Sequence, residues 1–360
     1  MSKVYLSGTD SEKLKSTIQD VFLKSTQGLE WLKSGDLVLL KPALNSMYPY
    51  PSTTHPMAVQ VLADILEKNG AKVVVGDQSG LRSVLHHPGG LVHGSSRVIY
   101  NKSGMELGGH KFIGFEERGW DDGFIHHKSL NTPSWPHGFY VTRCIEKADH
   151  IINLPRISTH TQAGASLGFK NMIGLLRDDS RMEYHANGPY NYLIKFNTRK
   201  SSLKSVDDHT GKFLEKIVEI SDSVREKLRL TLFVVTRAQT TFGPDQQAVD
   251  LGMLKIARAH VVDIKPGLVF ASTDPVAAET CALALLQYLR KSLPKLAKLY
   301  EAIILMSSNN PKKMENTLLK EHPYIKHAQN IDLGCLPSEF EFNKIPEDIK
   351  HVFNDIIDEN

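Results

Sequence analysis

The stretches Leu37-Val-Leu-Leu-Lys-Pro42 and Gly70-Ala-Lys-Val-Val-Val-Gly-Asp77 carry the strongest fold signal in the sequence. Each contains a continuous apolar run, which is typical of a strand buried on both faces of a parallel sheet. Between them, apolar residues recur at helical spacing after Pro56, which can occupy a first helical turn, and Gly70 ends this pattern. Strand, helix and strand with short connections predict a βαβ unit with two parallel neighbouring strands.

The same pattern returns three more times along the chain. Further apolar runs suited to strands lie at His150–Leu154, Leu232–Val235 and Leu268–Ala271. Amphipathic helices are expected over residues 212–227 and from Pro275 onward, where Asp274 is typical of a helix cap. Alternating strands and helices predict an α/β fold with a mostly parallel, twisted sheet and helices on both of its faces.

The region between the second and third predicted strands, residues 80–140, differs from the rest of the chain. It is rich in Gly and His and has weak periodicity. Because long structureless connections are rare inside compact domains, we expect an irregular insertion that either contains short strands, near residues 98–100 and 112–115, or forms a lid. With this insertion, residues 1–335 are predicted to form a single α/β domain, followed by a C-terminal extension over 336–360.

Composition excludes several classes of protein. The 360 residues carry 43 basic and 40 acidic side chains, and the net charge of +3 is too small to imply a nucleic-acid or membrane partner. Cys144, Cys281 and Cys335 are far apart, which argues against an intrinsic iron–sulfur cluster, a zinc knuckle or a disulfide framework. No signal-peptide pattern or membrane-length apolar run is present, so we expect a cytoplasmic protein.

Polar side chains follow the predicted strands at the points where they end. Lys41 and Asn45 follow the first strand, Asp77 ends the second, and the third opens the densest group, between residues 149 and 174. Because ligands of open α/β sheets bind outside the carboxyl ends of the strands, these residues are expected to line one crevice. Five parallel strands are assumed in this prediction.

The residue types in this crevice suit a small anionic or polar substrate. Arginine offers a planar fork of donors to a carboxylate or phosphate, lysine adds charge, and histidine transfers protons near neutral pH. The expected substrate-binding residues are Lys41, Asn45, Arg156, Thr159, Thr161, Asn171 and Arg181. The expected catalytic residues are His160, Lys170 and His185.

Two further motifs leave alternatives open. Ten of the sixteen histidines lie within a hundred residues, so a divalent metal is a candidate cofactor, with Asp77, His160 and His185 as its expected ligands; surface or structural histidines are the alternative. Gly164-Ala-Ser166-Leu-Gly168 matches the pattern of a hydrolase nucleophile elbow. The same glycines, followed by Lys170, also suit an anion site at a helix N-terminus or a tight joint between helix and sheet.

Several of these motifs occur together in a recognisable order. The matching segments are Lys41-Pro-Ala-Leu-Asn45, Gly70–Asp77, Asp149-His-Ile-Ile-Asn-Leu-Pro155, Thr159-His-Thr161, Phe169-Lys-Asn-Met-Ile-Gly174, Gly243-Pro244 and Ser272-Thr-Asp-Pro-Val-Ala-Ala278. In this order they resemble the family called domain of unknown function three-six-two. Some members carry ferredoxin-type modules, and the resemblance implies redox chemistry for those members. This chain lacks such cysteines, and it departs from the family at Thr236-Arg237 and at Glu279, where acidic residues and Asp are more usual.

Together, these features predict an uncharacterised enzyme that binds a small anionic or polar substrate at the carboxyl edge of a parallel sheet. Lysine and arginine would bind the anion, and histidine would supply acid–base or metal chemistry. One alternative is a non-catalytic binding module or a redox partner of a separate iron–sulfur protein such as a ferredoxin. A second alternative is a hydrolase that uses Ser166.

Overall fold

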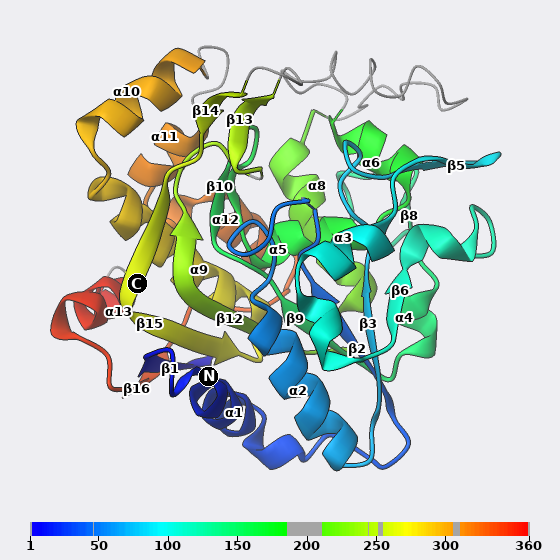
Figure 1. Cartoon of the computed structure of the whole chain (residues 1–360), viewed down its shortest axis with the longest axis horizontal. Coiled ribbons are helices and arrows are strands. Elements are labelled where there is room, and N and C mark those ends of the chain that lie inside the picture. The colour runs from blue at the N-terminus through cyan, green and yellow to red at the C-terminus, as the bar shows by residue number, and fades with distance from the viewer. Residues whose placement is uncertain are drawn as a thin grey trace.

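The computed structural model describes residues 2–45, 47–185, 211–243, 245–250, 255–304 and 310–358, so Pro244 of the motifs above lies outside the described residues. One mixed sheet runs through the molecule (Figure 1). Its strands, in spatial order, are β16 (Glu339–Asn343), β1 (Lys3–Thr9), β15 (Val261–Ser272), β12 (Leu228–Gln239), β9 (His150–Leu154), β2 (Leu37–Pro42), β3 (Lys72–Asp77) and β6 (Phe112–Gly114). The short strand β10 (Ser158–His160) pairs with β12 and with β11 (Gly164–Ser166).

Strand direction confirms a mostly parallel sheet and corrects one part of the prediction. β12, β9, β2, β3 and β6 are parallel to their neighbours in turn, whereas β15 is antiparallel to both β12 and β1. The expectation of five parallel strands is therefore wrong for β15. The physical reason is the connection between β12 and β15, which contains the hairpin of β13 (Gln247–Asp250) and β14 (Lys255–Arg258). A parallel neighbour needs a long crossover, usually a helix, whereas antiparallel neighbours can be joined by a hairpin.

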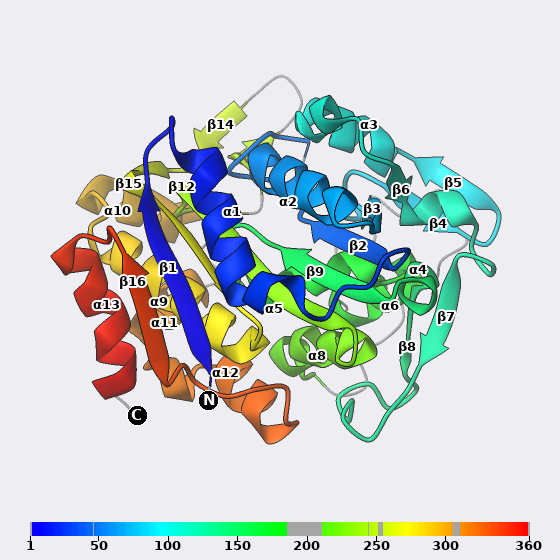
Figure 2. The same cartoon turned by 90° about the horizontal axis from the view of Figure 1, so that it is seen from below.

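Helices cover both faces of the sheet (Figure 2). One face carries α1 (Leu14–Ser25) and α2 (Pro56–Lys68), and the other carries α9 (Pro275–Lys291) and shorter helices around it. Along β2, Val38 and Leu40 pack with the α1–α2 layer, whereas Leu39 packs into the α9 layer. The continuous apolar run is explained by this arrangement, because successive side chains of a strand point to opposite faces.

The region of residues 80–140 contains short regular elements. These are β4 (Leu85–His87), β5 (Gly90–His93), α3 (Ser96–Lys102), β6, β7 (Phe124–His127) and the beginning of β8 (Phe139–Thr142). Residues 112–115 were expected to hold a strand, and β6 forms there and extends the sheet beside β3. Residues 98–100 instead belong to α3, which buries Ile99 and Tyr100 and leaves Val98 exposed.

The remaining helices lie after β8 and around α9. They are α4 (Cys144–Lys147), α5 (Gly168–Asn171), α6 (Asp178–His185), α8 (Phe213–Glu219), α10 (Lys295–Ile304), α11 (Asn310–Asn316), α12 (Pro323–Asn330) and α13 (Glu347–Asp358). Short 3₁₀ helices are η1 (Gln27–Leu29), η2 (Met105–Gly108), η3 (Phe115–Arg118), η4 (Met172–Leu175), η5 (Ile220–Val224) and η6 (Leu319–Glu321). The C-terminal segment supplies β16, which pairs in parallel with β1. Within the described ranges, no helix has the length and apolar character needed to span a membrane.

Candidate functional site

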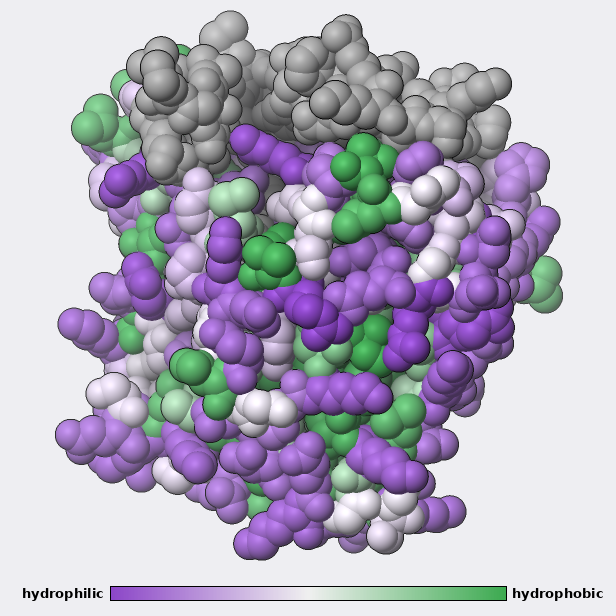
Figure 3. Space-filling model, turned by 45° about the vertical axis from the view of Figure 1, so that its right-hand side comes forward, coloured by the Kyte–Doolittle hydropathy of each residue, from purple (hydrophilic) through white to green (hydrophobic). Residues whose placement is uncertain are grey.

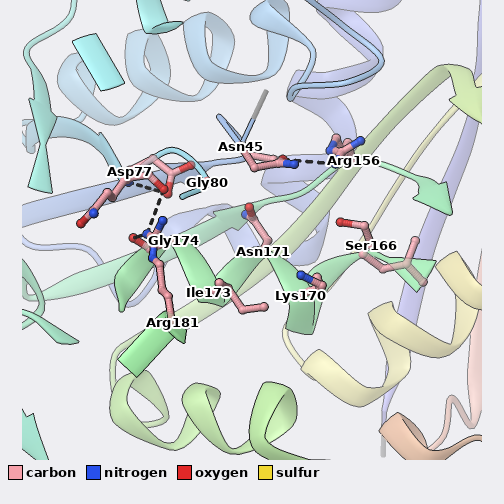
Figure 4. A pocket seen from close by; sticks show the side chains of 13 residues that line it. Asn45, Asp77, Gly80, Arg156, Ser166, Lys170, Asn171, Ile173, Gly174 and Arg181 are labelled. Carbon is pink, nitrogen blue, oxygen red and sulfur yellow. Dashed lines mark hydrogen bonds between the residues drawn. The ribbon is translucent and has the colours of Figure 1, made fainter. Parts of the chain in front are cut away.

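A small cavity of about 50 Å³ lies at the carboxyl edge of the parallel strands (Figure 4). Asn45 follows β2, Asp77 ends β3 and Arg156 follows β9, and all three line this cavity. Figure 4 shows Asn45 and Arg156 on one side of it and Ser166 and Lys170 on the other. Parallel strands therefore bring residues from distant parts of the chain to one edge, as the sequence predicts.

Arg156 is the most distinctive polar group of the cavity. Its residue is 2% exposed, and its Nη2 donates to Oδ1 of Asn45 at 3.2 Å. Nε and Nη1 are buried and have no hydrogen-bond partner among the described residues. Burial lowers the pKa of Arg156 to about 10, and the charge of Asp245 opposes this shift. A buried donor without a partner costs on the order of 1–3 kcal/mol, so this guanidinium is poised to gain from an acceptor.

Lys170 lies on α5 and reaches the same cavity. Its Nζ is 5.7 Å from the ring centre of Tyr184 and has no hydrogen bond within the described part of the chain. Burial, followed by the charges of Arg156 and Arg181, lowers the pKa of Lys170 to about 7. A large fraction of this amine is therefore neutral near pH 7, so it can accept a proton as well as release one.

Buried polar groups hold α5 in place. Oε2 of Glu279, on α9, accepts the backbone N–H of Phe169 at 3.0 Å, and burial raises the pKa of Glu279 to about 8. A Cβ on Gly168 would lie 2.8 Å from the same carboxylate oxygen, so glycine permits this close approach. Asn171 then donates to Oδ1 of Asn153 at 2.7 Å and to the carbonyl of Lys41 at 3.1 Å. These contacts fix the segment that carries Lys170.

Lys41 and Asp77 form an ion pair beneath the cavity. Their closest atoms are 2.7 Å apart, and both side chains are almost completely buried. Burial lowers the pKa of Lys41, and Asp77 opposes that shift. The carboxylate of Asp77 also accepts the backbone N–H groups of Leu44 and Gln78. Lys41 does not line the cavity, and Asp77 neutralises its charge. The positive charge that the sequence predicts at the cavity comes from Arg156 and Lys170.

Arg181 lines one end of the cavity, but its donors are occupied by the protein. Its Nε donates to the carbonyl of Leu176 at 2.9 Å, and its Nη2 donates to the carbonyls of Gln78 and Gly174 at 2.9 and 3.0 Å. Nη1 donates to the carbonyl of Ser79. Arg181 therefore joins the loop after β3 to the segment after α5, and this side chain holds the wall of the cavity together.

The two histidines expected to be catalytic lie outside the cavity lining. Nδ1 of His160 accepts the backbone N–H groups of Gln162 and Ala163, and Nδ1 of His185 lies 3.1 Å from Oε1 of Gln162. Burial, followed by the charge of Lys170, holds the pKa of both imidazoles well below their ordinary value. Both rings are therefore neutral at pH 7. They lie close enough to Lys170 for its charge to affect the pKa values of both imidazoles.

The two threonines serve the backbone nearby. Oγ1 of Thr159 accepts the N–H of Gly243 at 3.3 Å, and the N–H of Thr161 donates to the carbonyl of Gly243. Neither residue lines the cavity. They hold together the segment after β9 and the segment after β12.

The expected metal ligands do not assemble. Among the described residues, no group of three His, Cys, Asp or Glu side chains is arranged to hold a metal ion. Asp77 is engaged by Lys41 and two backbone amides, while the Nδ1 of His160 accepts two amides. Asp77 and the two histidines thus make other hydrogen bonds in this structure, and their sharing of a metal stays a prediction.

Ser166 lines the cavity but does not have the geometry of a nucleophile elbow. It lies in β11 opposite Ser158, and its φ is outside the left-handed region that a strained elbow uses. Within the ranges that the structure describes, no histidine is hydrogen-bonded to its hydroxyl. The pairing of nucleophile and base that a serine hydrolase needs is therefore not formed at Ser166.

Two positioning residues, Asn153 and Glu279, are absent from the residues expected from sequence. Asn153 interrupts the apolar run of β9, and Glu279 is a charged residue on an otherwise apolar part of α9. Both are completely or almost completely buried. A polar residue within a run of buried apolar residues needs a hydrogen-bond partner. Its presence in such a run is the sequence signal that could have identified Asn153 and Glu279.

Comparison with protein families matches residues 38–284 to the family described as Domain of unknown function (DUF362). No curated protein matches the chain. Among solved structures, the lactate racemase apoprotein from Thermoanaerobacterium thermosaccharolyticum is similar at 12% identity, over 97% of this chain and 85% of that chain, with a TM-score of 0.42. Likeness at this level carries no information about function.

Proposed function

The chain belongs to the DUF362 family, and we propose that it is an enzyme that binds a small carboxylate in the cavity and exchanges a proton with it through Lys170. The observation that carries this proposal is Arg156, a buried guanidinium with two unpartnered nitrogens beside a cavity that also holds Lys170. Each free N–H group of the guanidinium can donate a charge-assisted hydrogen bond to a carboxylate oxygen.

The size and walls of the cavity support a short substrate. Its volume of about 50 Å³ has room for an anion of a few non-hydrogen atoms. Ala43, Leu167 and Ile173 supply apolar surface to the lining, so charge is concentrated at Arg156 and Lys170. A carboxylate with a short carbon or hydroxyl substituent places its anionic end at Arg156 and its apolar part against these walls.

Lys170 supplies the proton chemistry in this proposal. The neutral amine accepts a proton from the carbon next to the carboxylate and becomes an ammonium, while the electron pair of the broken C–H bond is delocalised into the carboxyl group held by Arg156. The ammonium then returns a proton to that carbon or exchanges its proton with water. A bound carboxylate adds a negative charge near this ammonium and raises the pKa of Lys170 from about 7. Binding is therefore expected to be accompanied by proton uptake near neutral pH, and proton exchange should be fastest above the raised pKa, where the amine of the complex is neutral.

Ligand-induced thermal stabilisation tests this function. We expect a panel of two- to four-carbon carboxylates to raise the melting temperature of the wild-type protein, because ligands that bind only the folded state stabilise it by mass action. Arg156→Met should abolish this shift. Arg237→Met is the matched control, because Arg237 is 46% exposed and pairs with Asp263 away from the cavity lining.

Catalysis is tested separately from binding. Exchange of a ligand proton with deuterated solvent, followed by nuclear magnetic resonance, should occur with the wild-type protein and fall at least a hundredfold in Lys170→Met. Binding without exchange would support the non-catalytic binding module instead. Carboxylates that stabilise Arg156→Met as strongly as the wild type would contradict the proposed site.

A further inference from the structure

Ser166 places a hydroxyl group on the wall of the cavity, and the proposed function gives this group no role. The residue belongs to β11, lines the cavity and is 8% exposed. Its hydroxyl has no hydrogen-bond partner among the described residues. Figure 4 shows this hydroxyl directed toward the space between Arg156 and Lys170. It is therefore placed to contact a ligand that those two residues hold.

An unpartnered hydroxyl is informative only where water does not solvate it freely. The face of the molecule in Figure 3 is mostly hydrophilic, and polar side chains there are hydrated. Ser166 instead lines a cavity of about 50 Å³, which has room for only a few water molecules. Ser158, opposite it on β10, shows the ordinary case, because its hydroxyl donates to the carbonyl of Thr159 at 2.8 Å.

Three residues of the lining keep groups that are free to hydrogen-bond a ligand. These groups are Nε and Nη1 of Arg156, Nζ of Lys170 and the hydroxyl of Ser166, and none has a hydrogen-bond partner in the described part of the chain. Asp77 and Arg181, by contrast, are already bonded to protein groups. A guanidinium, an amine and a hydroxyl around one small cavity can contact three different parts of one ligand.

We propose that Ser166 determines the specificity of this site, because its hydroxyl binds a hydroxyl group on the carbon next to the carboxylate, and that the site takes one enantiomer of a short 2-hydroxy carboxylate. This inference rests on the proposed function, which places the carboxylate at Arg156 and the proton acceptor at Lys170. A serine hydroxyl can both donate and accept a hydrogen bond, and so can the hydroxyl of the ligand.

Charge argues against an amino group in place of the ligand hydroxyl. A 2-amino carboxylate carries an ammonium at neutral pH, and Arg156, Lys170 and Arg181 already line the cavity. Burial, followed by the charges of Arg156 and Arg181, lowers the pKa of Lys170, and a ligand ammonium would meet the same repulsion. An unsubstituted carboxylate avoids this repulsion but leaves the hydroxyl of Ser166 without a partner in the complex.

Three contacts also distinguish the two mirror-image forms of the ligand. Arg156 holds the carboxylate, Ser166 holds the hydroxyl, and Lys170 faces the hydrogen on the same carbon. In the other enantiomer the hydrogen and the remaining carbon substituent exchange places, so one of the three contacts is lost. The site is therefore expected to prefer one enantiomer.

Isothermal titration calorimetry with propanoate and the two enantiomers of 2-hydroxypropanoate tests the proposal. We expect the wild type to bind one enantiomer about tenfold more tightly than propanoate, because one hydrogen bond is gained. In Ser166→Ala this preference should disappear, whereas propanoate should bind as it does to the wild type. Ser158→Ala is the matched control and should keep the preference, because Ser158 pairs with Ser166 across β10 and β11 but does not line the cavity.

The possible outcomes separate this inference from the proposed function. If the wild type binds propanoate as tightly as either enantiomer, or if the preference persists in Ser166→Ala, the role of Ser166 is overturned and the carboxylate site at Arg156 stands. Equal affinity for the two enantiomers would also overturn the inference, because the three contacts distinguish them. A wild type that binds none of the three ligands would overturn both proposals. Labelling of Ser166 by a fluorophosphonate would assign its hydroxyl to nucleophilic chemistry instead.

Discussion

Asp77 and Asp274 both follow buried strands, yet they lie at opposite edges of the sheet. Asp77 ends the parallel strand β3 and pairs with Lys41 beneath the cavity. Asp274 follows β15, which runs antiparallel to β12, and its Oδ1 accepts the N–H groups of Val276 and Ala277 at the start of α9. Strand direction therefore decides which strand-end carboxylate belongs to the site and which one caps a helix.

The same substitution at both aspartates should separate these roles most strongly. Asp77→Asn leaves the buried ammonium of Lys41 without a counter-charge and should lower the free energy of unfolding by about 3–5 kcal/mol. Asp274→Asn keeps a good helix cap and should cost less than about 1 kcal/mol. Urea unfolding at pH 7 measures both values. Equal losses of unfolding free energy in the two variants would show that Asp77 and Asp274 do not have these different roles.

Substitutions at two glycines near these aspartates should cause stability losses of intermediate size. A Cβ on Gly174 would lie 1.8 Å from Oδ1 of Asp77, and a Cβ on Gly334 would lie 2.2 Å from Oδ1 of Asp274. The methyl group that Gly174→Ala adds would clash with a buried ion pair, so the substitution should lower the free energy of unfolding by about 2–4 kcal/mol. Gly334→Ala lies in a partly exposed loop and meets the end of the Asp274 side chain, and its φ of 157° adds backbone strain, so about 1–2 kcal/mol is expected. Thermal unfolding compares them, and a larger loss at Gly334 would contradict this ranking.

Lys170→Met should change stability less than Asp77→Asn does, and with the opposite sign. The pKa of Lys170 is about 7 in the folded protein and 10.5 as its ordinary value, so the unfolded state binds more protons between these values. Wild-type stability therefore rises with pH across that window. Because Lys170 is partly exposed, the substitution should stabilise by only about 1–3 kcal/mol at pH 7 and below, and the gain should disappear near pH 10.5.

Unfolding measured from pH 6 to pH 10 checks this prediction. Lys128→Met is the matched control, because Lys128 is exposed and does not line the cavity. This control should change stability little at any pH. A gain for Lys170→Met that is the same at every pH would show that its charge is not suppressed by burial.

The parallel part of the fold follows from local patterns. The apolar runs of β2, β3 and β9 and the helix between β2 and β3 predict parallel neighbours, and so they also predict the meeting of Asn45, Asp77 and Arg156. The direction of β15 does not follow from its own pattern, because a buried strand looks the same in either direction. The residues between β12 and β15 could have indicated the direction of β15, because they lack the amphipathic helix that a crossover to a parallel strand usually contains.

Side-chain pairing inside the site is harder to predict. Lys41 and Lys170 are both lysines near strand ends, and sequence patterns do not show that one meets Asp77 whereas the other faces the cavity. His160 likewise turns Nδ1 toward the backbone of Gln162 and Ala163. Such choices depend on contacts between segments more than a hundred residues apart in the case of Lys41 and Asn171, which periodicity does not encode. The roles assigned to these residues remain predictions.

A crystal structure of the protein soaked with a short carboxylate would locate the bound anion. We predict electron density for the carboxylate within hydrogen-bond distance of Nε or Nη1 of Arg156, with its other end toward Nζ of Lys170. Carboxylate density elsewhere, with the cavity occupied only by water and the guanidinium of Arg156 turned to protein acceptors, would contradict the account.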